Sequence, residues 1–183
     1  MLAYLTPQKP LKIAYSAERL MILYYKPYSF TMQSLQQKRK DKMPLQELKQ
    51  TQRDACVATC CAMLLNRPVE DVIEEFHKEF TNYLKTTDGY LAEHGVKVQR
   101  TEDRTTLLFN RIYMLLVPSL NTPGMFHQVL ADTRHGKVVI YDPSRNLRYS
   151  MEPEGEMERQ LLSWVIDYEV VEAPALKYKL EVH

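Results

Sequence analysis

The residues of this chain that best suit covalent chemistry lie in one short segment, "KQTQRDACVATCCAMLL", residues 49–65, which holds all three cysteines. Cys56 falls at the first turn of a predicted helix, where free N–H groups and the helix dipole favour a thiolate. Cys60 and Cys61 fall on the apolar bulk of that helix, where free cysteines pack as small hydrophobic residues. The pattern therefore predicts one candidate nucleophile, Cys56, and two structural cysteines.

A nucleophilic thiol needs a base, and His127 is the best placed of the five histidines. It lies within "MFHQVLAD", a predicted strand whose rigid backbone can aim the imidazole. The other four lie in predicted helices, in a hairpin turn or at the chain end: His77, His94, His135 and His183.

A catalytic histidine also needs a group that fixes its tautomer. Asp142 ends the next predicted strand, "VVIYDPS", and the turn "RHG" at 134–136 joins the two strands. His127 and Asp142 are then near-opposite neighbours across a hairpin. Asp132 is an alternative orienting group, but it falls on the opposite face of its strand, so Asp142 is preferred.

The oxyanion of an acyl-transfer intermediate requires a preorganised donor beside the backbone N–H of the nucleophile. Gln50 and Gln52 precede Cys56 by six and four residues. Gln50 is the preferred donor, and Gln52 is the alternative.

The order of these groups resembles the papain-like cysteine peptidases. It is closest to the stand-alone form of the family that removes double-glycine leader peptides from bacteriocins. The resemblance covers about residues 45–146 and rests on Gln50, on "CVATCCAM" from Cys56, on His127 followed by apolar residues, and on "DP" at Asp142. It implies that Cys56, His127 and Asp142 form a catalytic triad and that Gln50 completes the oxyanion hole.

Two positions depart from the family pattern. Ala55 stands where the family has aspartate, and Val57 stands where it has glycine, which affects access to the cleft beside the thiol. The membrane spans and ATPase of the transporter-fused members are absent from the sequence, so we do not expect export coupled to leader removal.

The elements that must position these residues indicate an α+β fold, with helices first and an antiparallel sheet after them. Residues 1–42 are predicted to form a basic extension, and 43–183 a papain-like domain. Expected helices cover 55–66, 68–80 and 89–95, with a break at Asp88-Gly89 and another helix near 159–164. Expected strands cover 96–100, 111–120, 125–133, 137–144, 164–173 and 176–182.

Charge and composition narrow the classes of partner. The net charge is +1, but it is unevenly distributed. Residues 1–53 contain ten basic and three acidic residues, which gives +7, and residues 54–183 contain fourteen basic and twenty acidic residues, which gives −6. The basic part suits an acidic partner, whereas nucleic acid is not expected because no recognised motif accompanies the charge. We expect no membrane span, no secretory signal, no cofactor and no metal, and we expect a reducing, cytoplasmic setting.

The sequence thus predicts a cysteine-dependent amide hydrolase that acts on peptide or isopeptide bonds of a peptide or protein substrate. The alternatives are a deamidase or acyltransferase on the same fold, and a non-enzymatic effector or inhibitor protein. A Cys56 sulfur that is buried or remote from His127 would favour the non-enzymatic class.

Overall fold

A computed structural model describes residues 43–180 of the chain. The chain divides into two units, 1–36 and 37–183, and the described residues belong to the second. The predicted basic extension, 1–42, lies outside the described residues.

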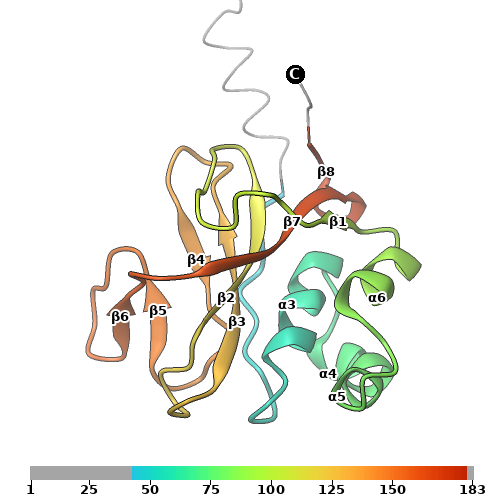
Figure 1. Ribbon diagram of the computed structural model, residues 1–183, viewed down its shortest axis with the longest axis horizontal. Coiled ribbons are helices and arrows are strands. Elements are labelled where there is room, and N and C mark those ends of the chain that lie inside the picture. The colour runs from blue at the N-terminus through green and yellow to red at the C-terminus, as the bar shows by residue number, and fades with distance from the viewer. Residues whose placement is uncertain (1–42, 181–183) are drawn as a thin grey trace, which may run out of the picture. The chain divides into compact units, whose positions relative to one another are not determined.

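The helices come first, as the sequence predicts (Figure 1). Helix α3 ends where Asn66 adopts a left-handed conformation (φ 52°), which asparagine tolerates better than most residues. The next helical segment begins after Pro68 and contains one wide π turn, Ile73–His77. The helices are α3 (Cys56–Leu65), α4 (Val69–Val72), α5 (Lys78–Thr81) and α6 (Thr87–Glu93).

The strands follow and form an antiparallel sheet in the order β1-β7-β2-β3-β4, with β8 paired to β7. A separate parallel pair consists of β5 and β6. The described residues therefore have an α+β fold. The strands are β1 (Lys97–Gln99), β2 (Ile112–Pro118), β3 (Phe126–Asp132), β4 (Val139–Tyr141), β5 (Arg148–Ser150), β6 (Glu158–Gln160), β7 (Val165–Ala173) and β8 (Tyr178–Lys179).

The sheet separates two apolar clusters. Leu130 of β3 packs in the cluster that contains α3, whereas Val129 and Ala131 pack in the other cluster, with Tyr149 of β5. This alternation is the two-residue period of a strand. From Ala58 to Leu65 every residue of α3 is buried, so packing holds this helix firmly against β3.

Helix α6 corrects one sequence expectation. Asp88 and Gly89 do not break the chain but lie in the first turn of α6. Thr86 precedes the helix, and its hydroxyl accepts a hydrogen bond from the Gly89 N–H at 3.3 Å. A Cβ at position 89 would lie 3.0 Å from that hydroxyl, so glycine permits the cap.

The helix expected near 159–164 is also wrong, because residues 158–160 form strand β6. The Glu158 carboxylate accepts hydrogen bonds from the Arg148 guanidinium, at 2.7 Å from Nη2, and from the Glu154 N–H. The bond from Arg148 joins Glu158 to the neighbouring strand β5, which pairs with β6 in parallel, and a helix would not allow that pairing.

Candidate active site

Cys56 is the first residue of α3 and is partly exposed. The residue at the N-cap is Ala55, and it supplies no capping side chain. From the sequence, Asp54 is also a candidate cap for this helix, but its carboxylate lies 3.4 Å from His77 Nε2 instead and is 69% exposed. The N–H groups of the first turn are therefore left without an N-cap side chain, beside the one partly accessible thiol among the described residues.

The other two cysteines belong to the core, as predicted. Cys60 and Cys61 are fully buried, and burial raises the pKa of both thiols well above the ordinary range. The Cys60 thiol donates to the carbonyl of Gln128 at 3.5 Å, which connects α3 to β3 one residue beyond His127.

His127 and Asp142 are in direct contact. His127 Nε2 donates to Asp142 Oδ1 at 2.7 Å, and the two side chains are 11% and 1% exposed. In the β3–β4 register Tyr141 is opposite Leu130, so Asp142 continues toward Val129 and meets His127 diagonally rather than directly across. The diagonal separation is within reach of an imidazole and a carboxylate.

The Asp142 carboxylate is held at both oxygens. Oδ1 also accepts from the Ser144 N–H at 2.8 Å, and Oδ2 accepts from the Tyr149 N–H at 2.7 Å. Backbone donors therefore fix the carboxylate before any substrate binds, and they compensate for its burial.

His127 has an unusual electrostatic environment. Burial alone lowers the pKa of the imidazole, but the hydrogen bond to Asp142, the charge of that carboxylate and the interaction with Cys56 raise it to about 9. His127 is consequently an imidazolium at neutral pH, in contact with the Asp142 carboxylate.

Asp132, the alternative orienting residue, serves another partner. Its carboxylate accepts from Arg134 Nε at 2.9 Å and from Arg134 Nη2 at 2.7 Å, and both side chains are 0% exposed. Asp132 ends β3 opposite Ile112, at the other end of the strand from His127. It stabilises the turn after β3 and does not orient His127.

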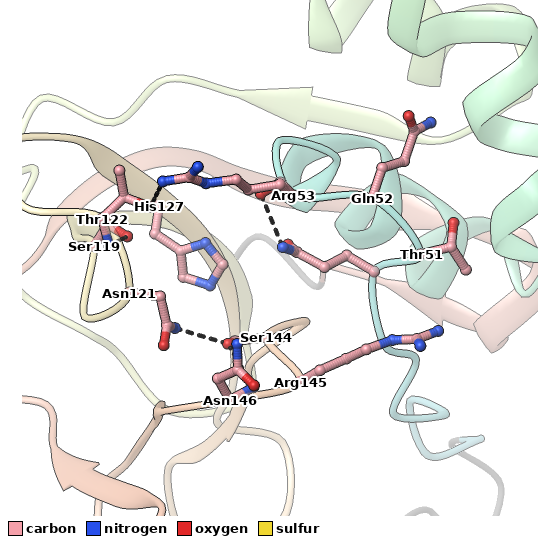
Figure 2. A pocket seen from close by; sticks show the side chains of 11 residues that line it. Thr51, Gln52, Arg53, Ser119, Asn121, Thr122, His127, Ser144, Arg145 and Asn146 are labelled. Carbon is pink, nitrogen blue, oxygen red and sulfur yellow. Dashed lines mark hydrogen bonds between the residues drawn. The ribbon is translucent and has the colours of Figure 1, made fainter.

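The two glutamines lie in the segment before α3. The Gln50 N–H donates to the Pro143 carbonyl at 2.8 Å, which ties this segment to the residue after Asp142. Gln50 Nε2 donates to the Arg53 carbonyl at 3.0 Å and has a second hydrogen free to donate. Gln52 is exposed, and in Figure 2 its amide points away from His127.

A polar pocket of about 290 Å³ lies beside His127 (Figure 2). We name it the His127 pocket. Inside it Asn121 Nδ2 donates to Ser144 Oγ at 2.9 Å. Its lining includes Gln50, Arg53, Asn121, His127, Ser144 and Arg145.

A second pocket, of about 540 Å³, is lined in part by Val57, the residue after Cys56. We name it the Gln128 pocket, after the residue that follows His127. Its lining includes Val57, Phe80, Tyr83, Leu116, Gln128 and Tyr168. Sequence reasoning did not single out Gln128, although a lone amide in the otherwise apolar run "QVLA" was a visible signal.

The remaining described histidines make polar contacts away from this pair. His77 Nε2 lies near Asp54, His94 Nε2 lies 3.5 Å from Glu75, and His135 Nε2 lies 3.8 Å from Asp132. His183 is outside the described residues. Within 43–180 no group of three or more His, Cys, Asp or Glu side chains is arranged to hold a metal ion.

Comparison with known proteins gave no family model, no curated protein and no solved structure that matches this chain. The geometry of the site must therefore carry any functional argument. In the part of the chain that the structure describes, none of the helices has the length and apolar character needed to cross a membrane.

Proposed function

We propose that this protein is a cysteine-dependent amide hydrolase with a papain-like arrangement, and that it cleaves peptide or isopeptide bonds. Cys56 is the nucleophile, His127 the acid and base, Asp142 the orienting carboxylate and Gln50 the oxyanion donor. The observation that carries the proposal is the His127 Nε2 to Asp142 contact of 2.7 Å, beside a partly exposed cysteine at a helix start. With Nε2 engaged, Nδ1 is the ring nitrogen left for the thiol.

In the acylation step the Cys56 thiolate attacks the substrate carbonyl carbon, and an S–C bond forms. The carbonyl π electrons move to oxygen, where the Cys56 N–H and Gln50 Nε2 stabilise the oxyanion. When the oxyanion collapses, the C–N bond breaks and His127 Nδ1 gives its proton to the departing amine. The products of this step are a free amine and a thioester on Cys56.

In the deacylation step His127, now neutral, accepts a proton from water as the water oxygen attacks the thioester. Collapse of the second tetrahedral intermediate breaks the C–S bond and releases a carboxylic acid. Cys56 leaves as a thiolate, which restores the pair with the imidazolium. Asp142 holds one tautomer and one ring orientation through both steps.

The His127 pocket favours hydrolysis of a peptide or isopeptide bond over deamidation, which releases ammonia. A deamidase releases a leaving group as small as water, which needs no pocket of its own. Here a pocket of about 290 Å³ is lined by His127, which is the group that must protonate the leaving amine. The accessibility of Cys56 and its effect on His127 also disfavour a purely non-enzymatic role.

The proposed chemistry needs a reduced thiol, and the free cysteines of the described residues suit a reducing, cytoplasmic compartment. It assigns no role to a metal or cofactor. An acidic partner for residues 1–42 stays a prediction.

The test is selective alkylation with iodoacetamide, followed by mass spectrometry of the three cysteines. Cys56 should react much faster than Cys60 and Cys61, and the rate should fall in His127→Ala. The matched control is His94→Ala, which removes a histidine that lies near Glu75 on the surface. Equal labelling of the three thiols, or a Cys56 rate that does not depend on His127, would exclude the proposed pair.

A further inference from the structure

The Gln128 amide is the most unusual polar group outside the catalytic set. Gln128 is 2% exposed, and its Nε2 has no hydrogen-bond partner among the described residues. No hydrogen bond to its Oε1 is found in residues 43–180 either. A buried amide without hydrogen-bond partners is unfavourable, so such a group indicates a ligand that completes its hydrogen bonds.

The position of Gln128 connects this amide to the proposed chemistry. Gln128 follows His127 in β3, and Val57 follows Cys56 in α3, yet both Gln128 and Val57 line the same pocket. His127 itself lines the other pocket. The His127 pocket therefore includes the base itself, whereas the Gln128 pocket is lined by the residues that follow Cys56 and His127.

This arrangement assigns the two parts of a substrate. The leaving amine must reach His127, so it occupies the His127 pocket. The acyl part stays bonded to the Cys56 sulfur, so we assign its side chains to the pocket that is lined by Val57, the next residue of α3.

We propose that the Gln128 pocket selects substrates with a glutamine or asparagine side chain on the acyl side of the cleaved bond. This inference rests on the proposed function and specifies its substrate class. A primary amide offers one acceptor and two donors, which is the complement of the Gln128 amide. Phe80, Leu116 and Val57 form apolar walls that suit the methylene groups of such a side chain.

The charged residues of the pocket do not favour a charged ligand. Lys85 Nζ lies 2.8 Å from Glu93 and 3.5 Å from Glu79, and the Arg100 guanidinium lies 5.5 Å from the centre of the Tyr168 ring. Asp167, also in the lining, would repel a carboxylate, and its burial raises its pKa. An uncharged side chain is repelled neither by the cations nor by Asp167, and the volume of about 540 Å³ accommodates a glutamine.

The experiment uses dipeptidyl vinyl sulfones, to which the Cys56 thiolate adds across the C=C bond while His127 protonates the adjacent carbon. Each of the two residues before the sulfone is varied in turn as glutamine, norleucine or glutamate, with alanine at the other position. Glutamine and norleucine have similar length, so their comparison isolates the amide. The measurement is the second-order rate of Cys56 labelling by the full chain.

At one of the two positions the glutamine probe should react about tenfold or more faster than the norleucine probe. In Gln128→Met, which keeps the length of the side chain, that ratio should fall to about one. The matched control is Gln160→Met, the same change at an exposed position of β6, which should keep the preference.

The possible failures are distinguishable. Iodoacetamide labelling of Cys56 that depends on His127, with equal rates for glutamine and norleucine probes, overturns this inference and leaves the proposed hydrolase intact. A glutamate probe that reacts fastest also overturns it, because the cations would then select the ligand. Absence of selective iodoacetamide labelling overturns the proposed function itself. Iodoacetamide labelling of Gln128→Met at the wild-type rate shows that this variant is folded.

Discussion

His127 and Asp142 meet diagonally across the β3–β4 pair, with Nε2 and Oδ1 2.7 Å apart. His127 lies in β3, and Asp142 directly follows β4. The backbone N–H groups of Ser144 and Tyr149 hold the Asp142 carboxylate in place. The imidazole is therefore oriented by a fixed charge rather than by a flexible side chain.

Replacing Asp142 by asparagine should lower the upper pH limit of peptide amide hydrolysis, because His127 must be protonated to give a proton to the departing amine. The carboxylate is one of the groups that raise the pKa of His127 to about 9, so its loss lowers the pH at which the imidazolium is deprotonated. We expect the alkaline limb of the hydrolysis profile to move down by about one pH unit or more. The measurement is the rate of hydrolysis of a peptide amide substrate from pH 6 to 10, with Glu158→Gln as the control carboxyl substitution. An unchanged alkaline limb would contradict the orienting role.

The same pKa predicts how stability depends on pH. His127 titrates at about 9 in the folded state against 6.5 as the ordinary value, so its protonated form stabilises the fold. This contribution is complete below pH 6.5 and is lost as the pH rises through 9. At about 1.4 kcal/mol per unit, the shift corresponds to on the order of 3 kcal/mol.

Urea unfolding of wild type and His127→Gln, from pH 6 to 10, checks this expectation. The difference in unfolding free energy between the two proteins should be constant below pH 6.5 and should shrink toward pH 9. A difference that grows as the pH rises would show that His127 is neutral in the folded protein.

The buried pair of Asp132 and Arg134 makes a prediction about stability alone. Arg134→Met leaves a carboxylate with 0% exposure without its cation, which costs about 3–5 kcal/mol. The double variant Asp132→Asn/Arg134→Met should recover part of that loss, because no charge is then left unpaired. Urea unfolding measures both variants, and the iodoacetamide rate of Cys56 should not change in the double variant. Slower labelling of the folded double variant would indicate that Asp132 acts at the site.

Much of this arrangement could be predicted because local signals were strong. The small and apolar residues from Ala58 onward, followed by Asn66, predicted α3 and placed Cys56 at its start. The turn at 134–136 predicted the hairpin that brings His127 near Asp142. His127 and Asp142 are not directly opposed, because the β3–β4 pairing ends at Asp132 and Val139. Arg134 donates a hydrogen bond back to Asp132 in the turn between these two strands.

Other features depend on contacts between distant segments, which a single sequence does not encode locally. Strand β6 depends on the bond from Arg148 to Glu158, ten residues away. The Gln128 pocket combines α3, β3 and the segment around Phe80. Each of these residues has an ordinary local pattern, and only the packing gives it a role.

The last prediction separates the two glutamines before α3. Gln50 is tied to the Pro143 carbonyl and lines the His127 pocket, whereas the amide of the exposed Gln52 points away (Figure 2). Loss of an oxyanion donor lowers kcat by about 10²–10³-fold. We expect this loss in Gln50→Ala, and we expect Gln52→Ala to stay within about twofold of wild type. The measurement is hydrolysis of a peptide amide substrate that carries glutamine on the acyl side.

Alkylation by iodoacetamide provides the internal control, because that reaction forms no oxyanion. Gln50→Ala should therefore keep a wild-type alkylation rate at Cys56 while it loses hydrolysis. If both rates fall together, Gln50 supports the position of the thiol rather than the transition state. If Gln52→Ala loses hydrolysis and Gln50→Ala keeps it, the oxyanion donor is Gln52, and the segment before α3 must rearrange when the substrate binds.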